Sequence, residues 1–400
     1  MRTIPDLGNL AGKRVLLRCD FNVPFQDGKI ADDGRILAAV PTIRRLLDSG
    51  TSVLICSHLG RPEGKVVDDL SLRMVGIRLA ELLGQDVGFA GDTIGEQARK
   101  LAETLLPGSV ALIENLRFNS AETSKDETIR KEFATKLAAL ADVFVSDGFG
   151  VVHRRQASVY ELAKLLPSAA GLLVEREVQV LAELSSSTRK PFTVVLGGSK
   201  VSDKLGVIGS LLPKVDNLVI GGGMVFTFLA AKGINVAASL LEEDQISVVQ
   251  GYLDQAKQLG VNIVLPTDIR MASKFAADAE IEIAAIEDLA QTRFGDKAIG
   301  LDIGPESEVR FAEVVANSKI CFWNGPMGVF EFERFASGTQ SVARALSQMD
   351  GLSVVGGGDS AAAVRALGFE DSDFSHISTG GGASLEYLEG KNLPGLEVLN

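Results

Sequence analysis

Polar and cationic residues follow four short apolar runs in the first half of the chain. They stand in residues 20–22 (DFN), 58–61 (HLGR), 115–117 (NLR) and 147–154 (DGFGVVHR). In doubly wound folds ligands bind beyond the carboxyl ends of the strands, so we expect these segments to converge on one cleft. Arginine suits such a place because its planar guanidinium binds one carboxylate or phosphate through two hydrogen bonds and stays charged. Arg61, Arg117 and Arg154 therefore predict a site for a small anion.

Taken singly, each of these arginines is better explained as a surface residue paired with one of the many carboxylates. Two of the three histidines in the chain, His58 and His153, fall in the same segments, which favours a functional role. Arg35, in residues 32–36 (DDGRI), is expected on a loop. It is either part of the site or a solvated charge.

Three glycine triplets end apolar runs in the second half of the chain, at residues 217–223 (NLVIGGG), 352–358 (LSVVGGG) and 376–382 (HISTGGG). Glycine lets the backbone turn tightly at a strand end, so that bare N–H groups close on a ligand. When a helix follows, its unpaired N–H groups and its dipole favour an anion. A single triplet is equally explained as a plain strand-to-helix turn, but three at equivalent places favour a phosphate-binding surface.

A fourth glycine turn lies in residues 193–204 (TVVLGGSKVSDK). Lys200 and Lys204 are one helical turn apart, so we expect them to face the same way; two solvated lysines are the alternative. The spacing excludes the P-loop pattern GxxxxGK[ST] here. Residues 60–66 (GRPEGKV) are also one residue short of that pattern.

Asp359 follows the triplet of residues 356–358 and precedes a helix predicted over residues 360–367. It is either the N-cap of that helix or a contact for Mg²⁺ carried by nucleotide phosphates. Read through Ala361, the segment also matches the dinucleotide pattern GxGxxA, which makes an NAD-dependent dehydrogenase the main alternative enzyme. That enzyme needs a ribose-binding acid after the following strand, where this chain has another glycine triplet.

The size and composition of the chain bound its class. A chain of 400 residues is too long for a single hydrophobic core, so two domains are expected. With 46% apolar and 23% charged residues it is typical of soluble globular proteins, and its net charge of −12 argues against general nucleic-acid or membrane binding. Cys19, Cys56 and Cys321 form neither a disulfide framework nor a zinc motif, which favours a reducing compartment. Without a signal segment or a long apolar run, we expect a cytoplasmic protein.

Short apolar runs alternate with amphipathic stretches, which is typical of an α/β fold. The predicted strands are residues 14–19, 52–57, 86–89, 110–114 and 142–146, followed by residues 192–196, 217–220, 261–265, 319–323, 352–355 and 375–378. Most are continuously apolar, as in parallel sheets covered by helices on both faces. The expected fold is therefore two doubly wound, Rossmann-like parallel-sheet domains joined by a helical hinge.

The expected domains are an N-terminal domain over residues 1–168, a hinge helix over 169–184 and a C-terminal domain over 185–385. Residues 169–184 (AAGLLVEREVQVLAEL) carry a helical apolar stripe, and a polar break follows at residues 185–189 (SSSTR). In residues 124–127 (SKDE), Ser124 is expected to cap a helix through residues 128–141. Residues 386–400 are left as a C-terminal tail.

Together these segments strongly resemble the phosphoglycerate kinase family. The matching blocks, in family order, are RCDFNVP (18–24), SHLGRP (57–62), ENLRF (114–118), LGGSKVSDK (196–204), IGGGMVFTF (220–228), GLDIGPES (300–307), WNGPMGVFE (323–331), VGGGDS (355–360) and STGGGASL (378–385). The resemblance implies reversible, Mg²⁺-dependent phosphoryl transfer between 1,3-bisphosphoglycerate and ADP, giving 3-phosphoglycerate and ATP, in glycolysis and gluconeogenesis. It also implies a monomer whose tail returns to the N-terminal domain.

The resemblance also implies residue roles. The glycerate substrate would be held by Asp20, Phe21, Asn22, Arg35, His58, Leu59, Gly60, Arg61, Arg117, His153 and Arg154. The nucleotide would be held by Gly197, Gly198, Lys200, Lys204, Gly222, Gly300, Leu301, Asn324, Pro326, Glu331, Gly357, Gly358, Asp359 and Ser360, with Glu331 at the ribose. Arg35, Lys200, Gly358 and Gly381 would face the transferring phosphoryl group, and Asp359 would approach the metal.

Some positions depart from the family pattern. Gly148, Val151 and Val152 replace an alanine and a threonine–alanine pair, which removes a hydroxyl near the substrate. Ser360 replaces a threonine and Ser199 an alanine. None of these changes removes a charged contact, so we expect them to affect affinity more than activity. A two-domain binding protein for a phosphorylated metabolite is the non-enzymatic alternative, but it leaves Lys200 and Lys204 unexplained.

Overall fold

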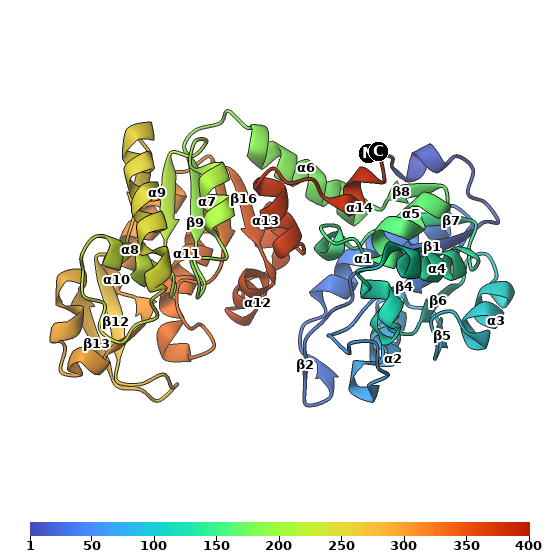
Figure 1. Ribbon diagram of the computed structural model, residues 1–400, viewed down its shortest axis with the longest axis horizontal. Coiled ribbons are helices and arrows are strands. Elements are labelled where there is room, and N and C mark those ends of the chain that lie inside the picture. Colours follow the sequence, from blue (N-terminus) through green and yellow to red (C-terminus); the bar gives the residue numbers. More distant parts are fainter. The chain divides into compact units, whose positions relative to one another are not determined.

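The computed structural model describes residues 1 to 400 and divides them into two compact units (Figure 1). Unit 1 comprises Met1–Gln179 and Asn392–Asn400, and unit 2 comprises Val180–Lys391. The division falls inside helix α6 (Leu172–Ser186), so this helix contributes residues to both units. None of the helices is both long enough and apolar enough to span a membrane.

Unit 1 contains a six-stranded parallel sheet in the order β5-β6-β4-β1-β7-β8. The strands are β1 (Arg14–Arg18), β4 (Ser52–Cys56), β5 (Val87–Ala90), β6 (Val110–Ile113), β7 (Val143–Ser146) and β8 (Ser168–Ala170). Its main helices are α1 (Gly34–Asp48), α2 (Arg73–Leu83), α3 (Glu96–Thr104), α4 (Glu127–Ala138) and α5 (Leu162–Leu165). The chain runs from β1 to β4 on one side and later to β7 on the other, so the topological switch point lies at β1. Ligands of such sheets bind at that point.

Unit 2 contains a second six-stranded parallel sheet in the order β11-β10-β9-β15-β16-β17. The strands are β9 (Phe192–Leu196), β10 (Asn217–Ile220), β11 (Asn262–Val264), β15 (Ile320–Asn324), β16 (Leu352–Gly356) and β17 (His376–Ser378). Numbered by their order in the chain, these strands lie 3-2-1-4-5-6 across the sheet, which is the Rossmann arrangement with its switch point between β9 and β15. The predicted α/β fold with two parallel sheets is confirmed.

The helices of unit 2 include α7 (Leu205–Leu211), α8 (Val225–Ala231), α9 (Ile246–Leu259), α10 (Pro305–Ala316), α11 (Ser337–Gln348), α12 (Gly358–Ala366) and α13 (Gly382–Leu388). Its core includes Trp323 on β15, Val195 on β9 and Val355 on β16, all fully buried. Unit 1 has its own core around β1 and β4. Burial of continuous apolar strands on both faces is what their sequences predict.

An antiparallel sheet in unit 2 was not predicted. Strand β12 (Asp268–Ala272) pairs with β13 (Ile281–Ala285) on one side and with β14 (Ile299–Ile303) on the other. Strand β13 has one buried residue among five, so it lacks the continuous apolar run that identifies the central strands. The short hairpin of β2 (Phe25–Gln26) and β3 (Lys29–Ile30) was missed for the same reason.

Two local predictions are wrong. The interdomain helix begins at Leu172 rather than at residue 169, because Ala169 and Ala170 are buried in β8 and pair with β7. Helix α4 is capped by Asp126, whose carboxylate accepts a hydrogen bond from Thr128 N at 2.8 Å. Ser124, two residues before this cap, instead accepts a hydrogen bond from Asp126 N, so Ser124 does not cap the helix as expected.

The C-terminal residues pack within unit 1. The N–H of Arg2 donates to Leu399 O at 2.6 Å, and Gly395, in α14 (Pro394–Glu397), donates to Val152 O at 2.8 Å. The two chain ends accordingly lie together in Figure 1. The tail that was predicted from residue 386 begins later in the structure, because α13 continues to Leu388 and unit 2 to Lys391.

Candidate active site

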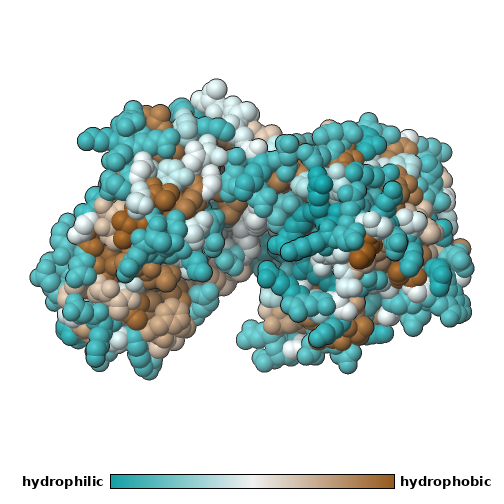
Figure 2. All heavy atoms as spheres, in the orientation of Figure 1, coloured by the Kyte–Doolittle hydropathy of each residue, from teal (hydrophilic) through white to brown (hydrophobic).

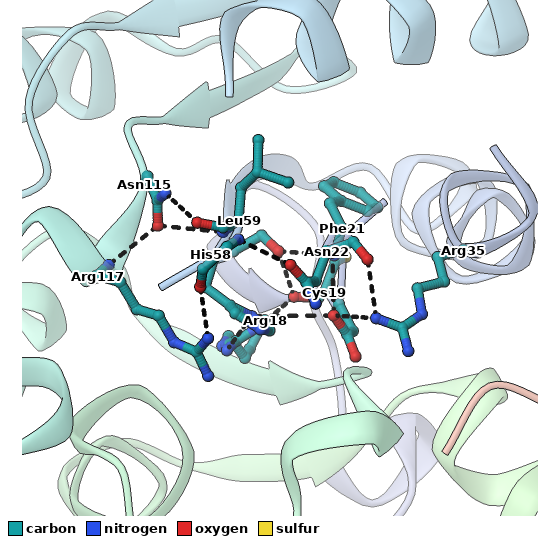
Figure 3. A network of polar contacts seen from close by, with 12 residues as sticks. Arg18, Cys19, Phe21, Asn22, Arg35, His58, Leu59, Asn115 and Arg117 are labelled. Carbon is teal, nitrogen blue, oxygen red and sulfur yellow. Dashed lines mark hydrogen bonds and ion pairs between the residues drawn. The ribbon is translucent and has the colours of Figure 1, made fainter. Parts of the chain in front are cut away.

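The segments after β1 and β4 are joined by hydrogen bonds (Figure 3). Ser57 Oγ accepts from Phe21 N at 2.8 Å and donates to Cys19 O at 2.7 Å. Beyond this contact, Gly60 N donates a hydrogen bond to Asn22 Oδ1 at 2.8 Å. The segments at the carboxyl ends of these two neighbouring strands, residues 19–22 and 57–60, therefore form one continuous wall of the cleft. The sequence predicts this convergence for parallel strands.

Asn115, fully buried after β6, attaches the third predicted segment to this wall. Its side-chain oxygen accepts from Leu59 N at 3.2 Å and from Arg117 N at 3.1 Å, and its nitrogen donates to Leu59 O at 2.7 Å. Arg117 Nη1 in turn donates to Gly60 O at 2.7 Å. The backbone of residues 59–60 is thus held from two sides, which fixes where Arg117 lies.

Arg35 lies on helix α1 as its second residue, so its predicted loop position is wrong. Its Nη1 lies 3.0 Å from Asn22 O and 3.4 Å from the carboxylate of Asp20. Burial alone raises the pKa of Asp20, but the neighbouring guanidinium charges, that of Arg35 first and then that of Arg18, outweigh it, and the net shift lowers that pKa. Asp20 therefore stays ionised and orients Arg35 at the switch point.

Arg117 is the arginine of this cleft whose surroundings most favour binding of an anion. Burial and the nearby charges of Arg18 and Arg154 lower the pKa of Arg117 to about 10. Its Nε is buried without a hydrogen-bond partner. A buried donor left unpaired costs about 1–3 kcal/mol, and more when charged, so an anion beside this guanidinium would be favourable.

The remaining predicted residues of this cleft differ in their burial. Arg61 and Arg154 are exposed, and Arg154 Nε donates to His153 Nε2 at 3.0 Å. Burial and the charge of Arg154 lower the pKa of His153 to about 4, so this ring is neutral near pH 7. Leu59 is buried with its backbone in the wall.

Asp147 belongs to the fourth predicted segment, and its side chain points to helix α6. Its backbone N–H donates to Arg18 O at 2.8 Å, while its Oδ1 accepts from Leu173 N at 3.0 Å. Gly171 is required beside it, because a Cβ there would lie 2.2 Å from Asp147 Oδ1. Asp147 therefore links the end of β7 to the first turn of α6.

The buried carboxyl of Asp147 predicts a pH-dependent stability. Burial raises its pKa to about 7 from an unfolded value of about 4, so the folded protein binds more protons than the unfolded chain between those values. The stability contributed by this residue therefore falls as the pH rises through that window. We expect the Tm of the wild type to fall relative to that of Asp147→Asn between about pH 5 and pH 8, measured by circular dichroism. The exposed Asp86→Asn is the control, and parallel curves for wild type and Asp147→Asn would contradict the assignment.

In unit 2 a cavity of about 510 Å³ opens beside the switch point of the sheet. Apolar side chains such as Phe226, Leu240 and Ile269 line it, together with the predicted residues Gly198, Gly222, Gly300, Leu301, Pro326, Glu331 and Asp359. Glycine is required at position 300, because a Cβ there would lie 2.1 Å from the ring of Phe226. The face in Figure 2 is mostly hydrophilic, with apolar patches on this unit. The cavity has the size and apolar lining of a small-molecule site.

A second cavity of about 290 Å³ adjoins the first and shares Gly198, Ser199 and Asp359 with it. Its lining is polar and includes the predicted residues Gly197, Lys200, Lys204, Asn324, Gly357, Gly358, Ser360 and Gly381. An apolar compartment that continues into one lined by lysines and glycine N–H groups matches a nucleoside followed by its phosphates.

The turns that line this polar cavity are joined by hydrogen bonds. Lys204 Nζ donates to Asn324 Oδ1, and Asn324 Nδ2 donates to Gly356 O at 2.6 Å. Ser360 Oγ is buried and accepts from Gly325 N at 2.7 Å. The hydroxyl retained at position 360 therefore joins two turns of the cavity, which gives it a structural contact besides the predicted ligand contact.

Two predictions about these turns are wrong in detail. Residues 199–203 are not helical, since α7 begins at Leu205, so the lysines share a cavity without sharing a helix face. Helix α12 begins at Gly358 with Gly357 as its N-cap, which excludes Asp359 as the cap. Gly357 has φ = 91°, a backbone conformation that glycine adopts without strain and other residues rarely do.

Asp359 fits a contact to a nucleotide-borne cation. It is exposed and lines both cavities. Burial lowers the pKa of nearby Lys204, with Asp203 and Asp359 opposing that shift. No three His, Cys, Asp or Glu side chains come together in the chain as a metal site, so further oxygens would come from the nucleotide phosphates, as is usual for Mg²⁺.

Sequence reasoning missed two buried residues that support the site. Arg18, at the end of β1, contacts His58, and Asp302 lies on the unpredicted strand β14. The carboxylate of Asp302 accepts from Gly338 N at 3.0 Å and lies 3.7 Å from Arg270. Burial raises the pKa of Asp302 to about 7. The sequence offers a charged residue at the end of an apolar run as the signal for Arg18, and a charged residue inside an apolar run as the signal for Asp302.

Comparison with known proteins assigns the chain to one family along nearly its whole length. The family model for phosphoglycerate kinase matches residues 4–391. The phosphoglycerate kinase of Clavibacter michiganensis subsp. michiganensis is 62% identical over 399 residues, covering 100% of this chain and 99% of that protein. The phosphoglycerate kinase of Bifidobacterium longum is 56% identical over 403 residues, covering 100% of both.

Solved structures agree with the sequence comparison. The structure of phosphoglycerate kinase from Coxiella burnetii superposes with a TM-score of 0.81 at 37% identity, covering 98% of this chain and 97% of that one. The crystal structure of phosphoglycerate kinase from Pyrococcus horikoshii gives a TM-score of 0.85 at 34% identity, covering 100% and 98%. The similarity therefore extends over both units.

Proposed function

The chain belongs to the phosphoglycerate kinase family, and on that premise we propose that unit 1 binds the glycerate substrate and unit 2 binds the nucleotide. The protein is a phosphoglycerate kinase that transfers a phosphoryl group reversibly between 1,3-bisphosphoglycerate and ADP, giving 3-phosphoglycerate and ATP. This activity replaces the dehydrogenase and binding-protein alternatives. The division of the substrates is supported above all by the unpaired, buried Nε of Arg117 in unit 1.

We propose that the non-transferring phosphate of the glycerate binds among Arg61, Arg117 and Arg154. Arg117 is already held by Gly60 O and Asn115, so its guanidinium loses little side-chain freedom on binding. Asp20 and Asn22 lie at the end of β1, where they would meet the hydroxyl and carboxylate end of the substrate. Burial lowers the pKa of Arg117 most, and repulsion from Arg18 and Arg154 lowers it further; a bound phosphate would relieve that repulsion.

We propose that the adenosine occupies the apolar cavity and the phosphates occupy the polar cavity that adjoins it. Glu331, exposed at the rim of the apolar cavity, would accept hydrogen bonds from the ribose hydroxyls. Lys204 and the N–H groups of the turn at Gly357 would contact the phosphates. Lys200 is exposed in the same cavity and would reach the phosphoryl group that is transferred.

The proposed chemistry requires no general base. In the ATP-consuming direction the nucleophile is the carboxylate of 3-phosphoglycerate, which is ionised near pH 7 because its pKa is about 4. Arg35 and Lys200, with the N–H groups of Gly358 and Gly381, would neutralise the charge that spreads over the transferring phosphoryl oxygens. The low pKa of His153 fits this scheme, since a neutral ring supplies no charge.

Members of this family use ATP and ADP with Mg²⁺, and we propose Asp359 as the protein contact of that ion. When bound, the ion neutralises phosphate charge. Asp359, near Lys204, would orient the nucleotide so that its terminal phosphate lies against Lys200. We also propose a cytoplasmic monomer without nucleic-acid or membrane partners, in keeping with the net charge of −12 and three buried free cysteines.

The two ligands must come together for the transfer, so we propose that the units close about helix α6. Reacting atoms need to approach to about 3–3.5 Å, so substrates held by separate units must be brought to that distance. We expect a smaller radius of gyration in solution scattering when 3-phosphoglycerate and a magnesium complex of a non-hydrolysable ATP analogue are both saturating. A radius that stays at the ligand-free value would contradict the proposal.

The assignment of ligands to units is tested by binding calorimetry on two variants. Arg117→Ala is expected to raise the Kd of 3-phosphoglycerate by about 10- to 100-fold, because it loses charged hydrogen bonds, and to leave the Kd of MgADP unchanged. Lys204→Ala is expected to show the reverse pattern. If Arg117→Ala weakens MgADP, or Lys204→Ala weakens 3-phosphoglycerate, the division of substrates between the units is wrong.

A further inference from the structure

Arg18 ends strand β1 beneath the cleft of unit 1, and only 1% of it is exposed. Its guanidinium makes three contacts, and Figure 3 shows two of the residues involved, Cys19 and His58. Nε donates to Ser158 Oγ at 3.0 Å, Nη1 donates to Cys19 O, and Nη2 lies 3.2 Å from His58 Nδ1. None of the roles proposed above uses this side chain.

Arg18 is held from behind by a buried acid. Ser158 Oγ donates to Glu122 Oε1 at 2.6 Å, and Ser158 N donates to Glu122 Oε2 at 3.0 Å. Ser158 and Glu122 are both fully buried, so the arginine cannot turn away without leaving polar groups unpaired. The contact between Arg18 and His58 is therefore a fixed feature of the fold.

The chemistry of this contact determines the tautomer of His58. A guanidinium has five N–H donors and no acceptor, so Nδ1 of the ring must accept. The proton of a neutral imidazole then sits on Nε2. The carboxylate of Asp20 lies 3.9 Å from Nδ1, too far to take a proton from it in a hydrogen bond.

The surroundings also keep the ring uncharged. Burial lowers the pKa of His58 well below its usual range, and Arg18, Arg117 and Arg35 lower it further, against the single opposing charge of Asp20. His58 is 3% exposed, its Nδ1 contacts Arg18, and its Nε2 makes no hydrogen bond within the protein. It is thus the ring atom that remains available to a ligand.

We propose that Arg18 is a positioning residue that locks His58 as the neutral Nε2–H tautomer, so that His58 offers the glycerate substrate one N–H donor and no charge. The substrate part of this inference rests on the proposed function. The positive charge of the cleft then comes from its arginines alone. His58 does not titrate near pH 7, and its contact with the substrate is the same on either side of that pH.

The tautomer is tested directly by nuclear magnetic resonance on the ligand-free protein labelled with ¹⁵N in its histidine rings. The chain has three histidines, and the signals of His58 are assigned by their absence in His58→Gln. We expect an unprotonated Nδ1 and a protonated Nε2, unchanged between about pH 6 and pH 8. His153 provides an internal contrast, because Arg154 Nε donates to its Nε2 and so predicts the opposite tautomer. A protonated Nδ1 on His58, or a charged ring, would overturn the proposal.

The role of Arg18 is tested by variants read in the same spectrum. Arg18→Lys keeps a donor-only cation and is expected to keep the tautomer, whereas Arg18→Met is expected to give a mixture of both tautomers. Arg154→Met is the matched control and is expected to change only the signals of His153. An unmixed Nε2–H signal for His58 in folded Arg18→Met would overturn the positioning role. If that variant does not fold, the wild-type and Arg18→Lys spectra still decide on the tautomer.

The contact with the substrate is tested by kinetics on His58 variants. The amide nitrogen of glutamine reaches about as far as ring Nε2, and that of asparagine about as far as Nδ1. We expect the KM for 3-phosphoglycerate to rise by about 10-fold or more in His58→Asn and by less in His58→Gln, with the KM for ATP unchanged. Equal rises in the two variants would overturn the Nε2–H contact. This result is independent of the spectrum, so a failure of the substrate assignment is distinguishable from a failure of the tautomer.

Discussion

Replacing Arg35 by alanine is expected to lower kcat by about 10²- to 10³-fold, the usual loss when one donor to the transition state is removed. Arg35 is oriented by the carboxylate of Asp20 and by Asn22 O, and the ionised state of Asp20 is maintained by the arginines around it. The same reduction is expected for Lys200→Ala in unit 2. Both are measured as kcat at saturating substrates, because a contact made only in the transition state changes kcat more than KM.

Arg45→Ala is the matched control for Arg35, since Arg45 is exposed at the far end of the same helix. We expect its kcat to equal that of the wild type. If kcat is unchanged in Arg35→Ala or in Lys200→Ala, that residue is a solvated charge without a catalytic role. The sequence analysis gave this alternative for both residues.

Replacing Trp323 by alanine is expected to destabilise unit 2 by about 3–5 kcal/mol, the usual cost of removing a large aromatic side chain from a core. Trp323 is fully buried in β15, and its Nε1 donates to Gly325 O at 2.7 Å. It therefore supports both the core and the turn that leads to Pro326 in the nucleotide cavity. Trp323→Phe keeps most of the side-chain volume, so we expect it to destabilise unit 2 less than Trp323→Ala does.

This loss is measured by urea unfolding followed by circular dichroism. A chain of two units need not unfold in one step, so the transition of unit 2 is identified as the one that MgADP shifts to higher urea. We expect Trp323→Ala to lower the midpoint of that transition and to leave the transition of unit 1 in place. An equal shift of both transitions, or none, would contradict the separate cores described for the two units.

The central strands were predictable because the signal for them, a continuous apolar run, lies within each strand's own sequence. Runs such as residues 192–196 are apolar at every position, which only a strand buried on both faces requires. Strand β13 has mostly exposed or half-buried residues, so no such run marks it. The placement of Arg35 failed for a related reason: helix α1 begins at Gly34, inside a stretch of turn-forming residues that gives no apolar period.

Candidate site residues were predictable from the sequence where their residue type alone indicates a role. Arginines after strands and glycines before helices are visible without a fold, and the structure brings Arg117 beside Gly60 and Lys204 beside Asn324. Their supports were not predictable. Arg18 is a buried cation whose partners are 40 and 140 residues away, and only the folded chain brings them together.

The structure also gives the three glycine triplets unequal places. Gly222 and Gly223 line the apolar cavity, whereas Gly357 and Gly358 line the polar one, with Gly381 and Gly382 from the third triplet. The second triplet, which continues into Asp359 and Ser360, therefore combines a helix N-terminus with the proposed metal contact. These places are the basis on which we propose phosphate binding at that turn and the adenosine pocket beside the first triplet.

The most direct test of the account is the initial rate of ATP consumption by the purified protein with 3-phosphoglycerate, coupled to reduction of the 1,3-bisphosphoglycerate formed. We expect turnover that requires 3-phosphoglycerate, ATP and Mg²⁺ together and that stops when the metal is chelated. The wild-type rate would be reduced by about 10²- to 10³-fold in Arg35→Ala and Lys200→Ala. A folded wild-type protein that binds NAD and shows no such turnover would contradict the account.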